Sequence, residues 1–179
     1  MKSTKHPTDP SNIDLSKVEQ AAAVCCRVTD HGEIEVLLLS SRDTGRWVLP
    51  KGFIEKHEPS FKAAQREALE EAGVLGKVRK RPIGRYSYRK DGARELTVAV
   101  HLLRFDRAKD DFREKSQRHS VWVSPIEASR CVDEPELKMI LSSLEMASSL
   151  TSQDRSLLKR IAASRHRNGS GLRSALTLS

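Results

Sequence analysis

Three glutamates, Glu67, Glu70 and Glu71, are the residues whose types and spacing point most clearly to chemistry. The sequence around them predicts a helix, because it is rich in alanine and leucine, has Pro59 as a suitable first helical residue, and reaches Gly73, which suits the left-handed residue just after a helix. Residues at i, i+3 and i+4 lie on one face of a helix. The three carboxylates are therefore expected to share a single face.

Such a face can bind a divalent metal ion. Like charges repel each other on an isolated helix, whereas a hard ion such as Mg²⁺ binds carboxylate oxygens, keeps several waters and bridges to phosphates. Arg66, next to Glu67 and eight residues after Glu58, is placed to orient the carboxylates from outside the metal shell. The alternative is a solvated acidic face with surface salt bridges. The three glutamates alone do not separate these interpretations.

The whole stretch resembles the signature of the Nudix hydrolases. That signature reads G-x5-E-x7-R-E-U-x-E-E-x-G-U, where U is a bulky aliphatic residue, and residues 52–74 match it at the fixed polar and glycine positions. Ala68 is a small residue at the first aliphatic position, and Val74 is an ordinary one at the second. The fixed positions are Gly52, Glu58, Arg66, Glu67, Glu70, Glu71 and Gly73.

The resemblance implies a fold, a metal ion and a reaction. The fold of this family is α+β, with a mixed β-sheet between helices in an α/β/α sandwich. Members bind Mg²⁺, with Mn²⁺ as the alternative, and a metal-activated water attacks phosphorus in a pyrophosphate. In this chain, the resemblance implies that the metal ligands are the carbonyl of Gly52 and the side chains of Glu67, Glu70 and Glu71.

The resemblance also suggests roles within the site. Glu71 is the first choice for the general base and Glu70 is its rival, because a base needs only hydrogen-bond reach to the water. Arg66 is counted with them in the catalytic group. Glu58 is interpreted as the partner of Arg66 outside the metal shell, with direct metal binding as the alternative.

The flanking residues favour a substrate with several phosphates. The run from Arg46 to Gly52, RWVLPKG, resembles the family branch that hydrolyses diphosphoinositol polyphosphates and diadenosine polyphosphates. That branch usually has glycines after the box glycine, whereas this chain has Phe53 and Ile54, a change that favours a nucleoside over an inositol. The expected substrate contacts are Arg42, Arg46, Lys51, Arg85, Tyr88, Arg89 and Arg118.

These contacts have plain structural alternatives. Any one of the cations, and Lys90 near them, is as consistent with a solvated surface charge as with a substrate contact. Tyr86 and Tyr88 both qualify as rings for a base to stack on, but one tyrosine of an alternating strand is expected in the core. Tyr88 is the preferred candidate for the substrate contact.

Two other reactions and one non-catalytic role remain open. ADP-ribose pyrophosphatases of this family usually carry a proline well past the box, and none occurs between Pro82 and Pro125. An RNA 5′-end pyrophosphohydrolase would use the same metal site while the basic residues 76–94 follow a nucleic-acid backbone. A Nudix-like ligand sensor would only bind, and such proteins tend to lose glutamates that this chain retains.

The chain is expected to contain one folded domain. Residues 1–17 predict a flexible leader, residues 18–148 the Nudix domain, and residues 149–179 a basic, Ser-rich extension that is partly helical and then disordered. Hydrophobic patterning predicts the order β-β-β-α-β-β-β-α, and Asp91 with Gly92 predicts a hairpin turn. The predicted strands are Val18–Val28, Ile34–Leu39, Trp47–Leu49, Arg85–Arg89, Leu96–Phe105 and Val121–Val123, and the helices after the box are residues 124–128 and 134–147.

Composition narrows the class of protein. With 37% hydrophobic and 31% charged residues in 179, the chain has a globular balance. No apolar run approaches the roughly 20 residues needed to cross a membrane, so no membrane partner and a cytoplasmic location are expected. The net charge of +8 favours an anionic small-molecule partner, with RNA less favoured. Cys25, Cys26 and Cys131 lack metal-ligand spacing and are expected to be buried free thiols.

Overall fold

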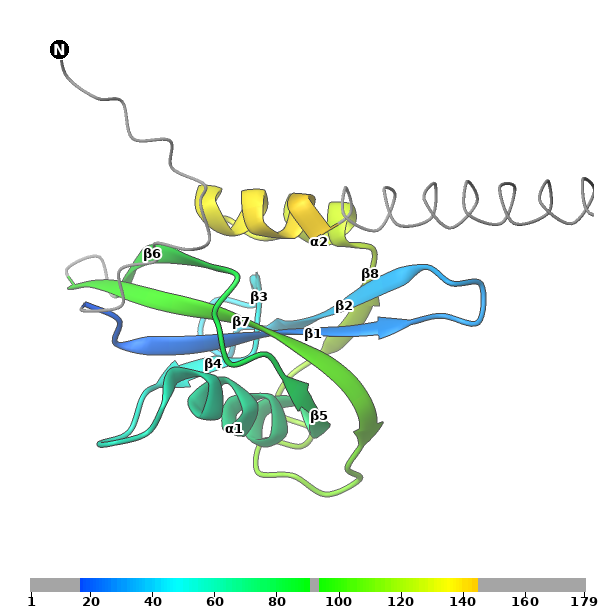
Figure 1. Ribbon diagram of the computed structural model, residues 1–179, viewed down its shortest axis with the longest axis horizontal. Helices are drawn as coiled ribbons and strands as arrows, with labels where there is room; N and C mark the ends of the chain where they lie inside the picture. The colour runs from blue at the N-terminus through cyan, green and yellow to red at the C-terminus, as the bar shows by residue number, and fades with distance from the viewer. Residues whose placement is uncertain (1–16, 91–93, 145–179) are drawn as a thin grey trace, which may run out of the picture. The chain divides into compact units, whose positions relative to one another are not determined.

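The computed structural model describes residues 17–90 and 94–144 (Figure 1). The predicted leader apart from Lys17, the hairpin turn at Asp91 and Gly92, and the chain beyond residue 144 lie outside the described residues. Residues 135–144 are helical. The other elements are, in chain order, β1 Gln20–Val28, β2 Ile34–Ser40, β3 Trp47–Val48, β4 Lys51–Phe53, α1 Ser60–Ala72, β5 Val74–Val78, β6 Gly84–Lys90, β7 Arg94–Ala108, β8 Ser120–Val123 and α2 Pro125–Cys131.

The strands form one mixed sheet. Its centre is the parallel pair β1 and β7, in which Gln20 lies opposite Val98 and Cys26 opposite Arg104. β2 and β4 run antiparallel to β1, whereas β5 and β6 run antiparallel to β7. β3 and β8 both pair with β2. The mixed sheet expected from the resemblance is confirmed.

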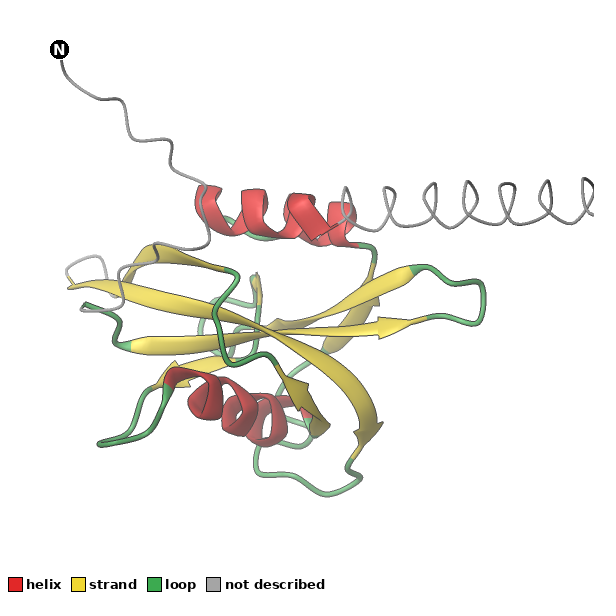
Figure 2. Ribbon diagram, viewed as in Figure 1, coloured by secondary structure: helices red, strands yellow, loops and turns green. Residues whose placement is uncertain are grey.

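Helices cover both faces of this sheet (Figure 2). Successive side chains of a strand point to opposite faces, so β1 contributes to two separate cores. Ala21 and Ala23 pack on the side of α1, whose Ala63, Ala64 and Ala68 are also buried there. The other core contains Ala22 and Val24 of β1 with Ala128, Leu137 and Leu141 from α2 and residues 135–144. This three-layer arrangement confirms the expected α/β/α sandwich, with small residues where α1 meets β1.

The ends of α1 follow local sequence rules with one correction. Pro59 is the residue that precedes the helix, with φ −66° and ψ 141°, and not its first helical residue. An extended conformation places Pro59 before the helix, so α1 begins at Ser60. Gly73 ends it in the left-handed region, at φ 66°, as predicted. The short helix α2 begins with a capping box between Ser124 and Glu127.

Two strands in the structure were absent from the prediction. β5 follows α1 directly, but Gly76 interrupts its apolar pattern and a register shift occurs between Leu75 and Gly76, so the sequence signal is weak. β4 holds three residues of the box itself, and β7 extends beyond the predicted strand at both ends to Arg94 and Ala108. Pairing with β1 and β7, which lie far away in the sequence, defines these strands.

The prediction of three buried thiols was wrong for one of them. Cys25 is buried and Cys26 partly so, whereas Cys131 is exposed at the end of α2. The buried face of α2 is formed by Pro125, Ala128 and Ser129, which leaves Cys131 on the outer side. Within residues 17–90 and 94–144, no helix is both long and apolar enough to cross a membrane.

Candidate active site

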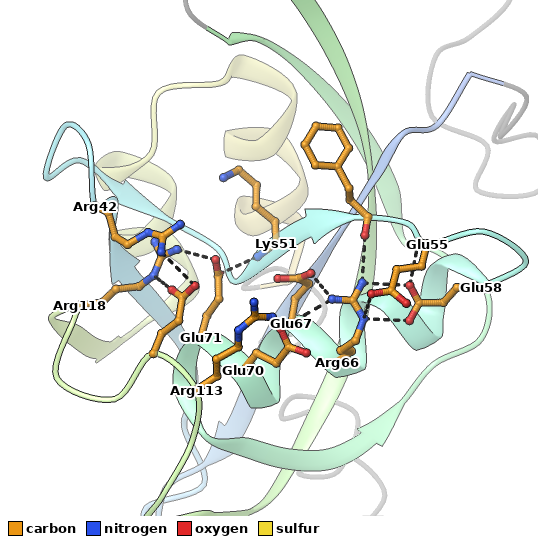
Figure 3. Close-up of polar contacts among 12 residues, drawn as sticks. Arg42, Lys51, Glu55, Glu58, Arg66, Glu67, Glu70, Glu71, Arg113 and Arg118 are labelled. Atoms are coloured by element: carbon orange, nitrogen blue, oxygen red, sulfur yellow. Dashed lines mark hydrogen bonds and ion pairs between the residues drawn. The ribbon is translucent and has the colours of Figure 1, made fainter.

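The three glutamates of α1 lie together beside β4 (Figure 3). Only 9% of the surface of Glu67 and 8% of that of Glu71 is exposed to solvent, although α1 packs on the outside of the sheet. A Cβ atom at Gly52 would overlap the carboxylate of Glu67, so only glycine allows β4 to approach this side chain so closely. Helix spacing and a glycine in the facing strand together create the cluster.

Glu71 is held from two directions. Its Oε2 accepts a hydrogen bond from the backbone N–H of Lys51 at 3.0 Å, and its Oε1 accepts one from the Arg118 guanidinium at 2.5 Å. Burial raises the pKa of Glu71 to about 7, while Arg118 and Lys51 favour the charged carboxylate. A carboxylate whose pKa lies near neutrality can take up or release a proton near pH 7.

Arg66 ties the loop before α1 to the helix. Its guanidinium donates to both oxygens of Glu58, at 3.1 and 3.0 Å, to Glu67 at 2.5 Å, and to the carbonyl of Phe53 at 2.9 Å. The hydrogen bond with Arg66 lowers the pKa of Glu58. The predicted pairing of Arg66 with Glu58 is confirmed. The two residues support Glu67 from outside the cluster of α1 carboxylates.

The loop between β7 and β8 also contributes to the site. Its Arg113 donates to Glu70 at 2.9 Å, and the N–H of Glu114 donates to the Glu70 carbonyl at 3.0 Å. Glu114 in turn accepts a hydrogen bond from Arg118 at 2.8 Å and pairs with Arg42 at 3.3 Å. Sequence reasoning missed Arg113 and Glu114. They lie in an irregular segment with no motif, so the only sequence signal was their charge.

The expected substrate cations divide into distinct groups. Arg118 is almost buried against Glu71 and Glu114, and Arg42 also pairs with Glu114. Arg46 pairs with Asp133 and Glu134 at 3.3 Å each, beside α2. The structure therefore brings Arg42 and Arg118 to one side of the carboxylates, while Arg46 lies in a different ion-pair cluster.

Lys51 and Tyr88 lie together, whereas Arg85 and Arg89 do not join them. The Nζ of Lys51 is 5.3 Å from the centre of the Tyr88 ring, and burial lowers the pKa of Lys51. Tyr88 also donates to Gln20 at 2.9 Å. Arg85 and Arg89 are exposed and alternate with Tyr88 along β6, so they point to its other face.

Tyr86 is the core tyrosine of the pair. It is 2% exposed and packs in the cluster on the α2 side of the sheet, and burial raises the pKa of its hydroxyl. Tyr88 is only partly buried against the same cluster. The predicted division between a core tyrosine and a more accessible one is confirmed. Whether Tyr88 contacts a substrate stays a prediction.

The donor set on α1 fits a hard divalent cation. All donors are oxygens, and two of the three carboxylates are buried, which is costly for like charges without a cation among them. In this structure the cations in contact are Arg66, Arg113 and Arg118. Within the described residues, no three acidic, histidine or cysteine side chains are arranged so that they could hold a metal ion together. Mg²⁺ is often bound through only one or two carboxylates, since it keeps several waters.

Curated proteins provide two informative matches. The chain is 33% identical over 106 residues to Nudix hydrolase 12, mitochondrial, of Arabidopsis thaliana. This match covers 54% of the present chain and 51% of the Arabidopsis protein. It is 31% identical over 108 residues to diphosphoinositol polyphosphate phosphohydrolase 3-beta of Bos taurus, covering 60% and 64%, respectively. The chain thus spans 51% to 64% of the length of these two relatives.

A solved structure and a family match cover more of the chain. The C. elegans Ap4A hydrolase in a binary complex is 25% identical, with a TM-score of 0.61, and the match covers 74% of this chain and 98% of that one. Residues 18–142 match the NUDIX domain family. This range contains α1 with its carboxylates, Gly52 of the facing strand and the loop that carries Arg118. By this match and the three-layer fold, the chain belongs to the Nudix family.

Proposed function

We propose that the protein is a pyrophosphohydrolase that cleaves a phosphoanhydride bond in a polyphosphorylated small molecule, using Mg²⁺ or Mn²⁺. One observation carries the proposal: the buried carboxylates of Glu67 and Glu71 lie against β4, with Glu67 beside Gly52 and Glu71 hydrogen-bonded to the Lys51 N–H. Buried carboxylates grouped in this way occur where a protein holds a cation or needs a base.

Each residue of the site has a role in this proposal. Glu67, Glu70 and Glu71, with the Gly52 carbonyl, would hold the divalent ion. When bound, the ion neutralises charge on the pyrophosphate and lowers the pKa of a water. Glu71 accepts the proton of the attacking water, and its fixed position next to the Lys51 N–H favours it over Glu70, which pairs with the exposed Arg113.

Arg66 acts as a positioning residue in this account. It spans Glu58, Glu67 and the Phe53 carbonyl, so it couples the loop before α1 to a metal-binding carboxylate. Its planar guanidinium makes several hydrogen bonds at once, which a lysine could not reproduce. Glu58 supports the metal site only by holding Arg66.

The substrate class rests on the relatives and on local charge. One relative is named a diphosphoinositol polyphosphate phosphohydrolase and a structural neighbour an Ap4A hydrolase, and both names denote enzymes of polyphosphates. Arg118, which pairs with Glu71, and Arg42, which pairs with Glu114, place positive charge beside the carboxylates. Cations beside the carboxylates favour a substrate with several phosphates.

Product formation by the purified protein tests this function. Diadenosine hexaphosphate, a diphosphoinositol polyphosphate, ADP-ribose and 5′-triphosphorylated RNA are compared with Mg²⁺ at equal concentration. Glu71→Gln serves as the blank, and Glu136→Gln, on an exposed glutamate of residues 135–144, as the matched control. Turnover of either polyphosphate, lost only in Glu71→Gln, supports the proposal. Faster turnover of ADP-ribose or RNA contradicts the substrate class, and no turnover of any compound contradicts the activity.

A further inference from the structure

Phe53 is an aromatic residue next to the metal-binding region that core packing does not explain. Its side chain is 44% exposed, and it belongs to neither core cluster, whereas its neighbour Ile54 packs in the core on the α1 side. Its backbone is fixed by pairing with Gln20 and by the hydrogen bond from Arg66 to its carbonyl. A rigid backbone therefore presents an exposed ring one residue from Gly52.

β4 and β6 meet through a reciprocal pair of cation–ring contacts. Lys51 of β4 lies with its Nζ 5.3 Å from the ring centre of Tyr88 in β6. Lys90 of β6 lies with its Nζ 5.6 Å from the ring centre of Phe53 in β4. Each strand thus contributes one ring and one ammonium group, two residues apart. We call Lys51, Phe53, Tyr88 and Lys90 the ring–lysine cluster.

The ring–lysine cluster lies on the side of β4 away from α1. Gly52 faces the carboxylate of Glu67, so Lys51 and Phe53 on either side of it point the opposite way. Figure 3 shows the side chain of Lys51 extending away from the glutamates, while its backbone faces Glu71. A phosphate chain at the carboxylates could therefore continue past Gly52 toward these two lysines and two rings.

This combination suits a nucleoside attached to phosphates better than a sugar alcohol attached to phosphates. An exposed aromatic ring stacks with the face of a nucleobase, whichever base it is. Lysine ammonium groups on flexible stems pair with phosphate oxygens. Lys90 is exposed and lies over the Phe53 ring, where it can pair with a phosphate next to that ring. An inositol ring has no π-system, so it cannot stack on Phe53 face to face as a base does.

We propose that Phe53 is the stacking surface for the base of a nucleoside-capped polyphosphate, with Lys90 and Lys51 binding the adjacent phosphates. The inference rests on the proposed function for its reaction, and it narrows the substrate from polyphosphates in general to those that carry a base. Phe53 would select the substrate and take no part in the reaction itself, because its ring lies on the side of β4 opposite Glu67.

Equilibrium binding tests the inference without turnover. Isothermal titration calorimetry of the full chain in EDTA compares diadenosine tetraphosphate with inorganic tetrapolyphosphate, which has the phosphates but no base. The variants are Phe53→Ala, Phe53→Leu, which keeps bulk without an aromatic face, and Phe53→Trp. Phe61→Ala is the matched control, because Lys62 lies 5.8 Å from the Phe61 ring in the first turn of α1, outside the ring–lysine cluster.

The wild type and Phe53→Trp are expected to bind the dinucleotide more tightly than tetrapolyphosphate. Phe53→Ala and Phe53→Leu should lose about tenfold in affinity for the dinucleotide, while their affinity for tetrapolyphosphate and that of Phe61→Ala for both ligands stay unchanged. Equal losses for both ligands, no loss in Phe53→Ala, or no preference in the wild type would each overturn the inference. If the preference is present but Mg²⁺ yields no product, the proposed function fails and the base site stands.

Discussion

Arg118 donates a hydrogen bond to Glu71 across 47 residues of sequence, with 2.5 Å between Nη2 and Oε1, and both side chains are 9% exposed. The arginine comes from the loop between β7 and β8, and the glutamate from α1. Their contact places a positive charge beside the carboxylate to which we assign the proton transfer. Two segments that are distant in the sequence therefore form the site, although the signature motif lies only in the segment that contains α1.

Replacing Arg118 with Met should destabilise the protein. Removing one member of a buried ion pair leaves Glu71 unpaired, and such changes typically cost about 3 kcal/mol or more in the free energy of unfolding. Urea denaturation measures this loss, with Arg130→Met on the exposed side of α2 as the control. The double variant Arg118→Met/Glu71→Gln should be less destabilised than the sum of the single variants. Additive losses would show that the two side chains are not coupled.

Arg66→Lys should weaken metal binding while the fold is retained. Lysine keeps the charge but cannot contact Glu58, Glu67 and the Phe53 carbonyl together. Loss of a residue that orients metal ligands typically lowers metal affinity about 10–100-fold. Mn²⁺ binding, followed by electron paramagnetic resonance, gives the affinity directly, with the exposed Arg107→Lys as the control. Unchanged Mn²⁺ affinity in Arg66→Lys would remove Arg66 from the metal site.

Gly52→Ala should weaken Mn²⁺ binding, whereas Gly45→Ala should lower only the stability of the fold. A Cβ at position 52 would displace the Glu67 carboxylate, so Mn²⁺ affinity should fall while α1 remains folded. Gly45 has φ +69° and no atom within 4 Å of an added Cβ, so Ala there strains only the backbone. Gly45→Ala should therefore lower stability by about 1 kcal/mol and leave Mn²⁺ binding intact. The converse pattern would contradict the placement of Gly52 against Glu67.

His101 should make stability depend on pH. It is fully buried, with Nε2 3.0 Å from the Ser60 hydroxyl and Nδ1 3.0 Å from the Arg79 carbonyl, and burial lowers its pKa from the usual 6.5. The unfolded chain then takes up a proton more readily than the folded one. The stabilisation is complete above pH 6.5 and is lost as the pH falls toward and below the folded pKa.

The measurement is the free energy of unfolding of the wild type and of His101→Gln at pH 7.5 and 5.5. Carboxylates common to both proteins contribute equally to any loss, so the difference between the two declines reports His101. The wild type should lose more stability than His101→Gln over this interval. Parallel declines would mean that His101 does not titrate differently on folding.

Local patterns predicted the parts of the site that one element determines. The spacing of Glu67, Glu70 and Glu71 gave a common face because helical geometry fixes the positions of i, i+3 and i+4. The pair Arg66 and Glu58 also lay within the motif, and Gly73 ends α1 as its position in the sequence predicted.

Contacts between distant segments were not predictable in the same way. Arg118 was expected to contact the substrate, which stays a prediction. Its contacts with Glu71 and Glu114 were not foreseen, because the loop between β7 and β8 brings these residues together. Arg113 carried no motif, and its contact with Glu70 depends on the course of that loop. Lys90 lies over Phe53 only because β4 and β6 meet in space, although the two residues are far apart in sequence. Tertiary packing, which sequence patterns do not encode locally, decides these contacts.

The most direct test of the account is hydrolysis of diadenosine tetraphosphate with Mg²⁺ in ¹⁸O-water, comparing the wild type, Glu71→Gln and Glu136→Gln. If Glu71 takes the proton from a water that attacks phosphorus, ¹⁸O appears in a phosphate product, and Glu71→Gln is slower by about 10²-fold or more. Glu136→Gln should match the wild type. A Glu71→Gln variant as fast as the wild type, or a product without ¹⁸O on phosphorus, would contradict the account.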